Sequence, residues 1–306
     1  MRELLLVPVV ALSLGLSACV IVGDDWGAHY NKDFHSNYPL KAGGRVSVET
    51  FNGSVEVSGW DENTVDIVGT KFASTQSEAD NMRVDIDATP DSVSIRVPRP
   101  ALGHNQGARF VIKVPNKAVL SRISTSNASI RTQNGAGPAR LKSSNGSIHV
   151  TDFQGALDAE TSNSTVELMN VQGDVVAHSS NGPIRAVHLA GSLDASTSNG
   201  SIQGSFDRAD RPVRAETNNN SVELSFPPHF ASDVRVNTSN GGITVRLPDD
   251  FRGQISARTS NASVTSDFDI QSHGELKRSQ IEGVIGSGGP LIQLNTSNSG
   301  IHLQRR

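Results

Sequence analysis

One six-residue phrase recurs along this chain, with an asparagine at its third position, as in Thr197-Ser-Asn-Gly-Ser-Ile202. The asparagines of the nine copies are Asn127, Asn145, Asn163, Asn181, Asn199, Asn219, Asn240, Asn261 and Asn298. The first five follow one another at a constant step (145−127 = 163−145 = 181−163 = 199−181 = 18), and the later steps are 20, 21, 21 and 37. Such a register is the signature of a repeat architecture, which limits the chain to folds built from stacked units.

The residues around each asparagine alternate between apolar and polar. The third residue after it is always Ile or Val, the fourth before it is Ile, Leu, Val or Ala, and the second before it is Thr or Ser. Polar residues stand between these columns, and period-two alternation is typical of half-buried strands. A glycine stands ten residues after four of the asparagines, at Gly137, Gly155, Gly173 and Gly191. One coil is therefore expected to have two short strands that meet at an Asn corner, and a short third side that ends in a Gly corner.

The length of the repeat selects the class of repeat fold. Eighteen residues are too few for a strand–helix–strand unit, but they suffice for one turn of a solenoid whose coils stack about 4.8 Å apart. We therefore predict an all-β, single-stranded parallel β-solenoid (β-helix) with about 18–21 residues per coil. Turn chemistry alone accounts for Asn at the corner, and a stacked Asn column also allows amide-to-amide hydrogen bonds.

The N-terminal segment predicts export and lipidation. Arg2 precedes an apolar run that ends in Leu16-Ser-Ala-Cys19, which is too short for a membrane span and resembles a bacterial lipobox. The resemblance implies diacylglycerol on Cys19, the only cysteine of the chain, and cleavage before it. Lipid on Cys19 would anchor the protein to a membrane. Val20 follows the cysteine, and by resemblance to Gram-negative lipoprotein sorting the lack of Asp there favours the outer membrane.

The chain divides into four predicted parts. Residues 1–18 are expected to be the lipoprotein signal peptide and residues 19–44 a lipidated tether. Residues 45–120 are expected to form an N-terminal β cap region with an early corner at Asn52-Gly53 and one short helix over Ser77–Met82. Residues 121–306 hold the solenoid repeats, interrupted by a loop or hairpin insertion at about 267–291.

Neither composition nor side-chain clusters predict catalysis or a cofactor. The net charge is −4 without a basic stripe, which argues against nucleic acid as a partner. The nine histidines stand singly, so no metal site is expected. Asp158 and Asp194 lie in one column two coils apart, about 9.6 Å by the strand spacing, which suits an inverting glycosidase, but Val176 separates them. Glu167 and Arg185 on adjacent coils are expected to help set the register.

The repeated phrase, the run Phe110-Val-Ile-Lys-Val-Pro115 and the run Ile285-Gly-Ser-Gly-Gly-Pro-Leu-Ile292 together resemble a known family. This is the bacterial putative-adhesin family of β-strand-repeat lipoproteins, catalogued as a domain of unknown function, and the resemblance covers Arg45 to Leu303. It implies an envelope-facing solenoid and supplies no catalytic residues.

We therefore predict a non-enzymatic, lipid-anchored surface in the bacterial cell envelope that binds polysaccharide or another envelope protein. The alternative is a carbohydrate-active enzyme, a polysaccharide lyase or hydrolase, on the same β-helix. A third reading is a structural or sensory component that binds only protein partners.

Overall fold

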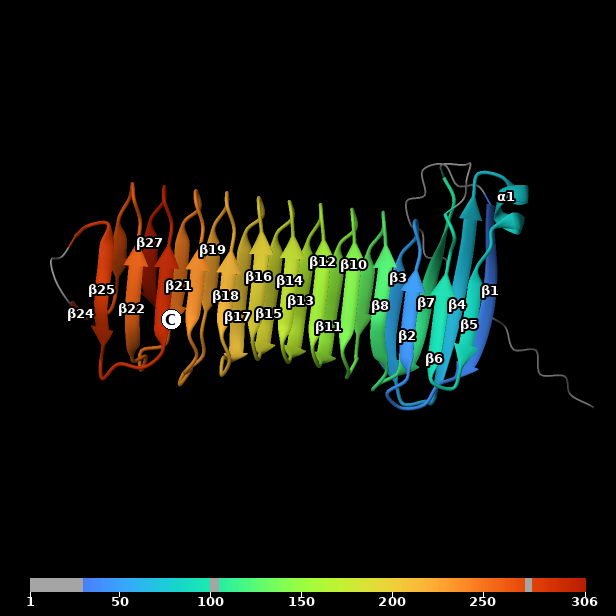
Figure 1. Cartoon of the computed structure of the whole chain (residues 1–306), viewed down its shortest axis with the longest axis horizontal. Coiled ribbons are helices and arrows are strands. Elements are labelled where there is room, and N and C mark those ends of the chain that lie inside the picture. The colour runs from blue at the N-terminus through green and yellow to red at the C-terminus, as the bar shows by residue number, and fades with distance from the viewer. Residues whose placement is uncertain (1–29, 100–104, 273–276) are drawn as a thin grey trace, which may run out of the picture.

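A computed structural model describes residues 30–99, 105–272 and 277–306. Cys19 and the predicted signal peptide lie outside these ranges. The described chain forms two long β-sheets that face each other along one elongated stack (Figure 1). It has a single short helix, which confirms an all-β class with mostly parallel strands.

The first sheet, called sheet A, has the strand order β1-β4-β7-β3-β9-β11-β13-β15-β17-β19-β21-β27-β23. Its strands, in chain order, are β1 Tyr30–Pro39, β3 Val55–Trp60, β4 Thr64–Ala73, β7 Gly107–Pro115, β9 Ile130–Gln133, β11 Ile148–Gln154, β13 Val166–Gln172, β15 Ile184–Ala190, β17 Ile202–Arg208, β19 Val222–Ser225, β21 Ile243–Leu247, β23 Val264–Ser266 and β27 Ile301–Arg305.

The second sheet, called sheet B, has the order β24-β25-β22-β26-β20-β18-β16-β14-β12-β10-β8-β2-β6-β5. Its strands are β2 Arg45–Glu49, β5 Asp85–Thr89, β6 Ser92–Arg96, β8 Val119–Thr125, β10 Ala139–Ser143, β12 Leu157–Thr161, β14 Val175–Ser179, β16 Leu193–Thr197, β18 Val213–Glu216, β20 Val234–Asn237, β22 Gly253–Arg258, β24 Gln271–Ser272, β25 Gln280–Ile285 and β26 Leu291–Asn295.

Each regular coil contributes one strand to each sheet. The chain passes along sheet B, turns at the Asn corner, runs along sheet A and returns through the Gly corner, so that β10 pairs with β12 and β11 with β13 in parallel. The short third side is a continuation of the sheet A strand beyond a bend, and it forms no third sheet. The bend is a left-handed residue, with φ of 54° at Asn134, 53° at Asp152, 54° at Asn170 and 58° at His188. Asn, Asp and His are the side chains that tolerate this region best.

The core lies between the two sheets. The inward columns of the repeat are buried along the whole stack, for example Ile148, Val166, Ile184 and Ile202, each at most 1% exposed. Phenylalanines fill the wider coils near the C-terminal end, where Phe206 stacks on Phe226 at 5.0 Å between ring centroids and Phe226 on Phe230 at 4.5 Å. Burial of these apolar columns is the main stabilising term.

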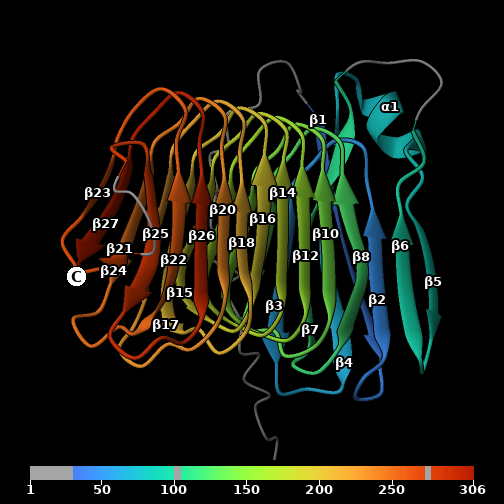
Figure 2. The same ribbon diagram turned by 60° about the vertical axis from the view of Figure 1, so that its left-hand side comes forward.

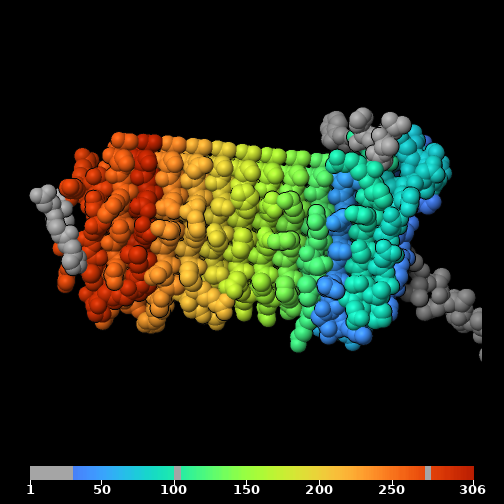
Figure 3. All heavy atoms as spheres, viewed as in Figure 1, coloured from blue at the N-terminus to red at the C-terminus, as the bar shows by residue number. Residues whose placement is uncertain are grey.

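The coils at both ends are stacked out of sequence order. The last coil, β26 and β27, lies between the coil of β20 and β21 and the coil of β22 and β23. At the other end the coil of β2 and β3 lies between β6 and β7 on one side and β8 and β9 on the other. Figure 2 shows β26 between β20 and β22, and Figure 3 shows the resulting red stripe among orange coils and blue stripe between cyan and green. The coil of β2 and β3 and the coil of β26 and β27 are thus each held between segments from other parts of the sequence.

Antiparallel strands close the N-terminal end. The tether predicted up to residue 44 is wrong over its second half, because β1 pairs with β4 from Tyr30 to Pro39 and turns alternate side chains inward. The predicted helix is confirmed as α1 Gln76–Asn81, with Thr75 and Glu78 forming a capping box. At the C-terminal end, the segment predicted as an insertion holds β24 and β25, and β25 pairs antiparallel with β22.

Candidate binding surfaces

The repeated asparagines form one continuous column of side-chain hydrogen bonds at the exposed corner. The Nδ2 of each asparagine donates to the Oδ1 of the asparagine on the neighbouring coil, at 2.5–2.8 Å, from Asn52 through to Asn261. Asn298 lies between Asn240 and Asn261, in agreement with the order of the coils. Each amide between the two end members, Asn52 and Asn261, uses one donor and one acceptor within the ladder, so its second N–H and second lone pair are directed elsewhere.

A second ladder runs beneath the first. The Thr or Ser two residues before each asparagine is buried, as its inward position in the alternation predicts. Thr161 Oγ1 donates to the carbonyl of Gly146 on the preceding coil at 2.9 Å, and Thr217 Oγ1 donates to that of Gly200 at 2.9 Å. The hydroxyl can also accept, as Ser143 Oγ does from the Gly146 N–H at 2.9 Å. The hydroxyls therefore pair buried backbone groups that would otherwise cost about 1–3 kcal/mol each.

Rows of charged side chains cover the outer face of sheet B. Asp158, one of the two carboxylates considered for catalysis, lies 2.8 Å from the Nε of Arg140, and Lys142 lies 2.7 Å from Glu160. Val176 separates Asp158 from Asp194 in the strand register. The structure therefore does not join the two carboxylates into a pair, and it places a cation on one of them.

Two carboxylates of sheet B and its turns are held strongly ionised. The hydroxyl of Ser192 and the guanidinium of Arg211, both at 2.7 Å, lower the pKa of Asp174. The guanidinium of Arg214, at 2.9 Å, lowers the pKa of Glu216. Both groups are anions at neutral pH and cannot act there as general acids.

Sheet A also has a column of charged side chains on its outer face, and the sequence spacing predicted their contacts only in part. Glu167 and Arg185 are neighbours in the register of β13 and β15. The carboxylate of Glu167, however, lies 3.0 Å from the Nδ1 of His149 on the coil before it. A residue of such a column has one neighbour on the preceding coil and one on the following coil. The sequence does not predict with which of the two its side chain pairs.

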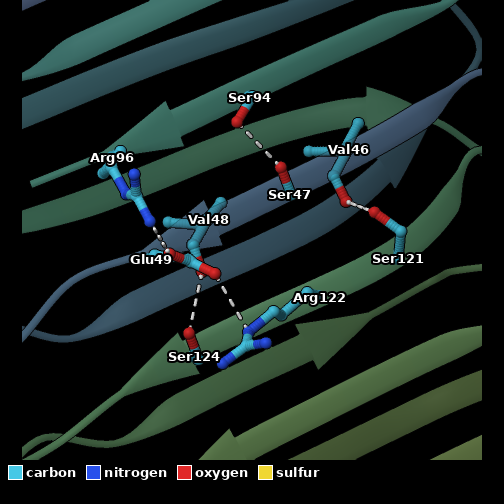
Figure 4. Close-up of polar contacts among 9 residues, drawn as sticks. All are labelled: Val46, Ser47, Val48, Glu49, Ser94, Arg96, Ser121, Arg122 and Ser124. Carbon is cyan, nitrogen blue, oxygen red and sulfur yellow. Dashed lines mark hydrogen bonds and ion pairs between the residues drawn. The ribbon is translucent and has the colours of Figure 1, made fainter.

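The inserted N-terminal strand β2 is tied to both neighbours by polar contacts, as Figure 4 shows. Glu49 lies 3.2 Å from Arg96 on β6 and 3.0 Å from Arg122 on β8. Ser47 donates to Ser94 on β6 at 3.0 Å. One carboxylate thus bridges three strands that are far apart in the sequence.

Three hollows of similar size mark the surface. One of about 370 Å³ lies beside α1, against Glu78 and Met82. A groove of about 410 Å³ crosses β8, β10 and β12 on sheet B, with mostly apolar lining from residues such as Leu120 and Leu157. The third, of about 400 Å³, lies at the turns near the C-terminal end and includes Phe230 and Phe251.

Among the described residues, no three His, Cys, Asp or Glu side chains come together as metal ligands. Within the same ranges, no helix has the length and apolar character needed to cross a membrane.

Comparison with known proteins finds a catalogued domain that matches part of the chain. Residues 170–277 match the model of a domain of unknown function (DUF7330). No curated protein sequence matches the chain.

Two solved structures are similar to this chain. A putative adhesin from Bacteroides fragilis is 12% identical, with 70% of this chain and 96% of that chain covered and a TM-score of 0.42. A putative cell adhesion protein from Clostridium sporogenes is also 12% identical, with 90% and 100% covered and a TM-score of 0.21. At these values neither likeness bears on what this chain binds.

Proposed function

We propose that this chain is a lipid-anchored protein of the bacterial envelope, whose β-solenoid serves as a non-enzymatic, adhesin-like or scaffolding surface. Its partner would be a polysaccharide or another envelope protein. Lipid on Cys19 would hold the stack at a membrane, in the outer membrane of a Gram-negative cell.

The observation that carries the proposal is the pair of long, regular outer faces. Polar and charged side chains stand on them in columns, and neighbours along a column neutralise each other, as in the pairs of Arg140 with Asp158 and Lys142 with Glu160. A rigid face with a constant repeat suits a partner that is itself extended or repetitive, since many weak contacts then act together. Asp158, Glu160 and Asp174 are each paired with a cation.

The anchor and the binding surface call for separate measurements on the full chain. In cell fractionation we expect the parent protein in the membrane fraction and Cys19→Ser in the soluble fraction, because two or more acyl chains anchor a protein stably. If Cys19→Ser fractionates with membranes like the parent, the lipid anchor is wrong.

Binding is tested by passing the full chain, in mild detergent, over a panel of immobilised polysaccharides while new reducing and unsaturated sugar ends are assayed. Retention without new ends would support the proposal. Release of new ends would replace it with the enzyme. The absence of retention, together with cross-links to envelope proteins in intact cells, would support the protein-binding arm alone.

A further inference from the structure

The regular Gly corner is replaced by other segments in the coils near the C-terminal end. Where earlier coils make the Gly turn, longer loops over residues 226–233 and 248–252 lead into β20 and β22. The chain segment that leads into β26 is instead Gly286-Ser-Gly-Gly-Pro290. Because β26 lies between β20 and β22, this segment with almost no side chains lies between two bulky loops. Departures from a local rule often mark functional sites.

The arrangement leaves a hollow of about 400 Å³, which we call the notch; it is lined by His229, Phe230, Asp250, Phe251, Arg252 and the backbone of residues 288–290, among others. Its size falls within the range of about 300–1,000 Å³ that is usual for small-molecule sites. The rings of Phe230 and Phe251 stack at 5.1 Å between centroids and expose only 7% and 5% of their surface, so they present an apolar floor.

The rim of the notch is polar. The Nδ1 of His229 lies 2.7 Å from the Oδ2 of Asp250, which joins the two long loops. The neighbouring Asp249 is occupied by Arg305 at 3.1 Å. Arg252 is exposed, and within the described ranges its guanidinium has no hydrogen bond or ion pair. The acids of the rim are therefore matched, and one cation remains available.

Glycine is required where the segment crosses the notch. Gly288 has φ of 83° and Gly289 has φ of 155°, and a Cβ at Gly289 would come within 2.8 Å of the carbonyl oxygen of Arg252. The alkyl part of Arg252 lies against Gly286, where a Cβ would be 2.9 Å from its Cγ. The missing side chains both open the notch and orient the arginine.

We propose that the notch binds a sugar unit that carries a carboxylate, such as a hexuronate residue of an acidic polysaccharide; this inference rests on the proposed function and names its ligand class. Arg252 would bind the carboxylate through paired N–H groups. His229 and Asp250 would hydrogen-bond ring hydroxyls, and the C–H groups of the ring would lie on the Phe floor.

Two further observations favour recognition of an anion at a local site over unspecific attraction, and over binding of an extended peptide. The net charge of −4 opposes unspecific attraction of polyanions, so binding of one requires a local site. An extended peptide would recognise a free sheet edge. Here β20, β26 and β22 are each paired on both sides, which leaves no such edge beside the notch.

The test uses the full chain with hexuronate oligomers, and neutral hexose oligomers as the matched ligand. Arg252→Gln removes the cation, and Ala231→Trp fills the notch from an exposed position on its lining. Lys117→Gln, in the exposed turn between β7 and β8 and outside both outer faces, is the control for loss of one exposed positive charge. Calorimetry or immobilised-sugar retention gives the affinities, and thermal melting checks that each variant is folded.

We expect the parent and Lys117→Gln to bind hexuronate oligomers alike and in preference to neutral ones. Arg252→Gln should bind at least about tenfold more weakly, since a charge-assisted hydrogen bond contributes about 1.5–3 kcal/mol. Ala231→Trp should bind more weakly by a similar factor. Hexuronate retention that both variants leave unchanged would overturn the notch and leave the proposed function standing. A parent that no polysaccharide retains would overturn the notch and the polysaccharide arm of the proposed function. Equal retention by polyphosphate would overturn the sugar assignment alone.

Discussion

At the scale of single residues, the corner of this protein is built from two ladders with different environments. The asparagine amides are exposed and bond to one another, whereas the hydroxyls of the Thr and Ser column are buried and bond to backbone. Buried polar groups depend more on their partners than exposed ones do. Substitutions in the two columns should therefore differ in cost and in their dependence on pH.

Asn181→Asp should weaken the exposed ladder in a pH-dependent way. Asn181 donates to Asn163 and accepts from Asn199, both at 2.7 Å, and a carboxylate at its position would face the oxygen of Asn163. The folded state then favours the protonated acid, which raises its pKa above the unfolded value, so stability falls as pH rises through the acid range. We expect a loss of about 1–3 kcal/mol at neutral pH that shrinks at low pH, measured by denaturant unfolding. Ser180→Asp beside it is the control, and an equal, pH-independent loss in both variants would argue against the ladder.

Thr161→Val tests the buried ladder with little change in shape. It removes the donor to the Gly146 carbonyl, and we expect a loss of about 1–2 kcal/mol in unfolding free energy. Thr132→Val is the matched control, because its hydroxyl is also buried but has no hydrogen-bond partner among the described residues. That change should be neutral or stabilising. The same loss at both positions would mean that volume, and not hydrogen bonding, sets the cost.

At the scale of elements, the alternation of apolar and polar residues decides which face of each strand is buried. The edge of a sheet is protected by the strand that pairs with it. Ile184 is 1% exposed while the next residue, Arg185, is exposed on the outer face of β15. The antiparallel β1 closes one edge of sheet A. The interior of a strand and the docking of an edge strand should therefore respond differently to substitution.

Ile184→Asp should unfold or severely destabilise the stack, by more than about 4 kcal/mol, because the carboxylate would have no partner between the sheets. Arg185→Asp, one residue further, should change stability by about 1 kcal/mol or less. Thermal unfolding followed by circular dichroism compares the two. If Ile184→Asp melts with the parent, the alternation does not specify the inner face.

Asp66→Asn should loosen β1 from β4. The imidazole of His35, at 2.6 Å, lowers the pKa of Asp66, with help from the amide of Asn37 at 3.3 Å. Because the pKa of Asp66 is lower in the folded state, its ionised carboxylate stabilises the fold at pH values above the unfolded pKa of about 3.9. This stabilisation is lost as the pH falls through the folded-state pKa. Amide hydrogen exchange in β1 should thus be faster in the variant at neutral pH and similar to the parent in strong acid. Faster exchange throughout the stack would indicate a global effect instead.

At the scale of the whole molecule, the order of the coils is the feature that regular repetition does not contain. A simple solenoid ends in a coil that covers only its neighbour, so its loss spares the rest. Here the last coil is enclosed by β20 and β21 on one side and β22 and β23 on the other. The last coil is therefore packed on both sides, and the coil of β22 and β23 is attached to the stack through it.

Deletion of residues 291–306 should expose more than one coil. Strands β22 and β25 lose their only link to sheet B through β26, so we expect their amides to lose exchange protection together. The coils of β10 to β17 should keep theirs, because coupling in a stack acts between nearest neighbours. Retained protection of β22 in the truncated chain would show that the outer coil does not depend on the inserted one.

The sequence by itself determined the coil: its length, the inward columns, the Asn corner and the all-β class, because each depends on contacts between equivalent positions of successive units. It also contained a signal for the left-handed bend that we did not predict, because the bend residues Asn134, Asp152, Asn170 and His188 are of types that tolerate positive φ. Only the tertiary structure decided which coil lies beside which, where β1 docks, that Glu167 turns to His149, and that the notch exists. The physical reason is that every coil presents nearly the same backbone edge to its neighbours. The repeat therefore specifies how a coil is paired but not with which other coil.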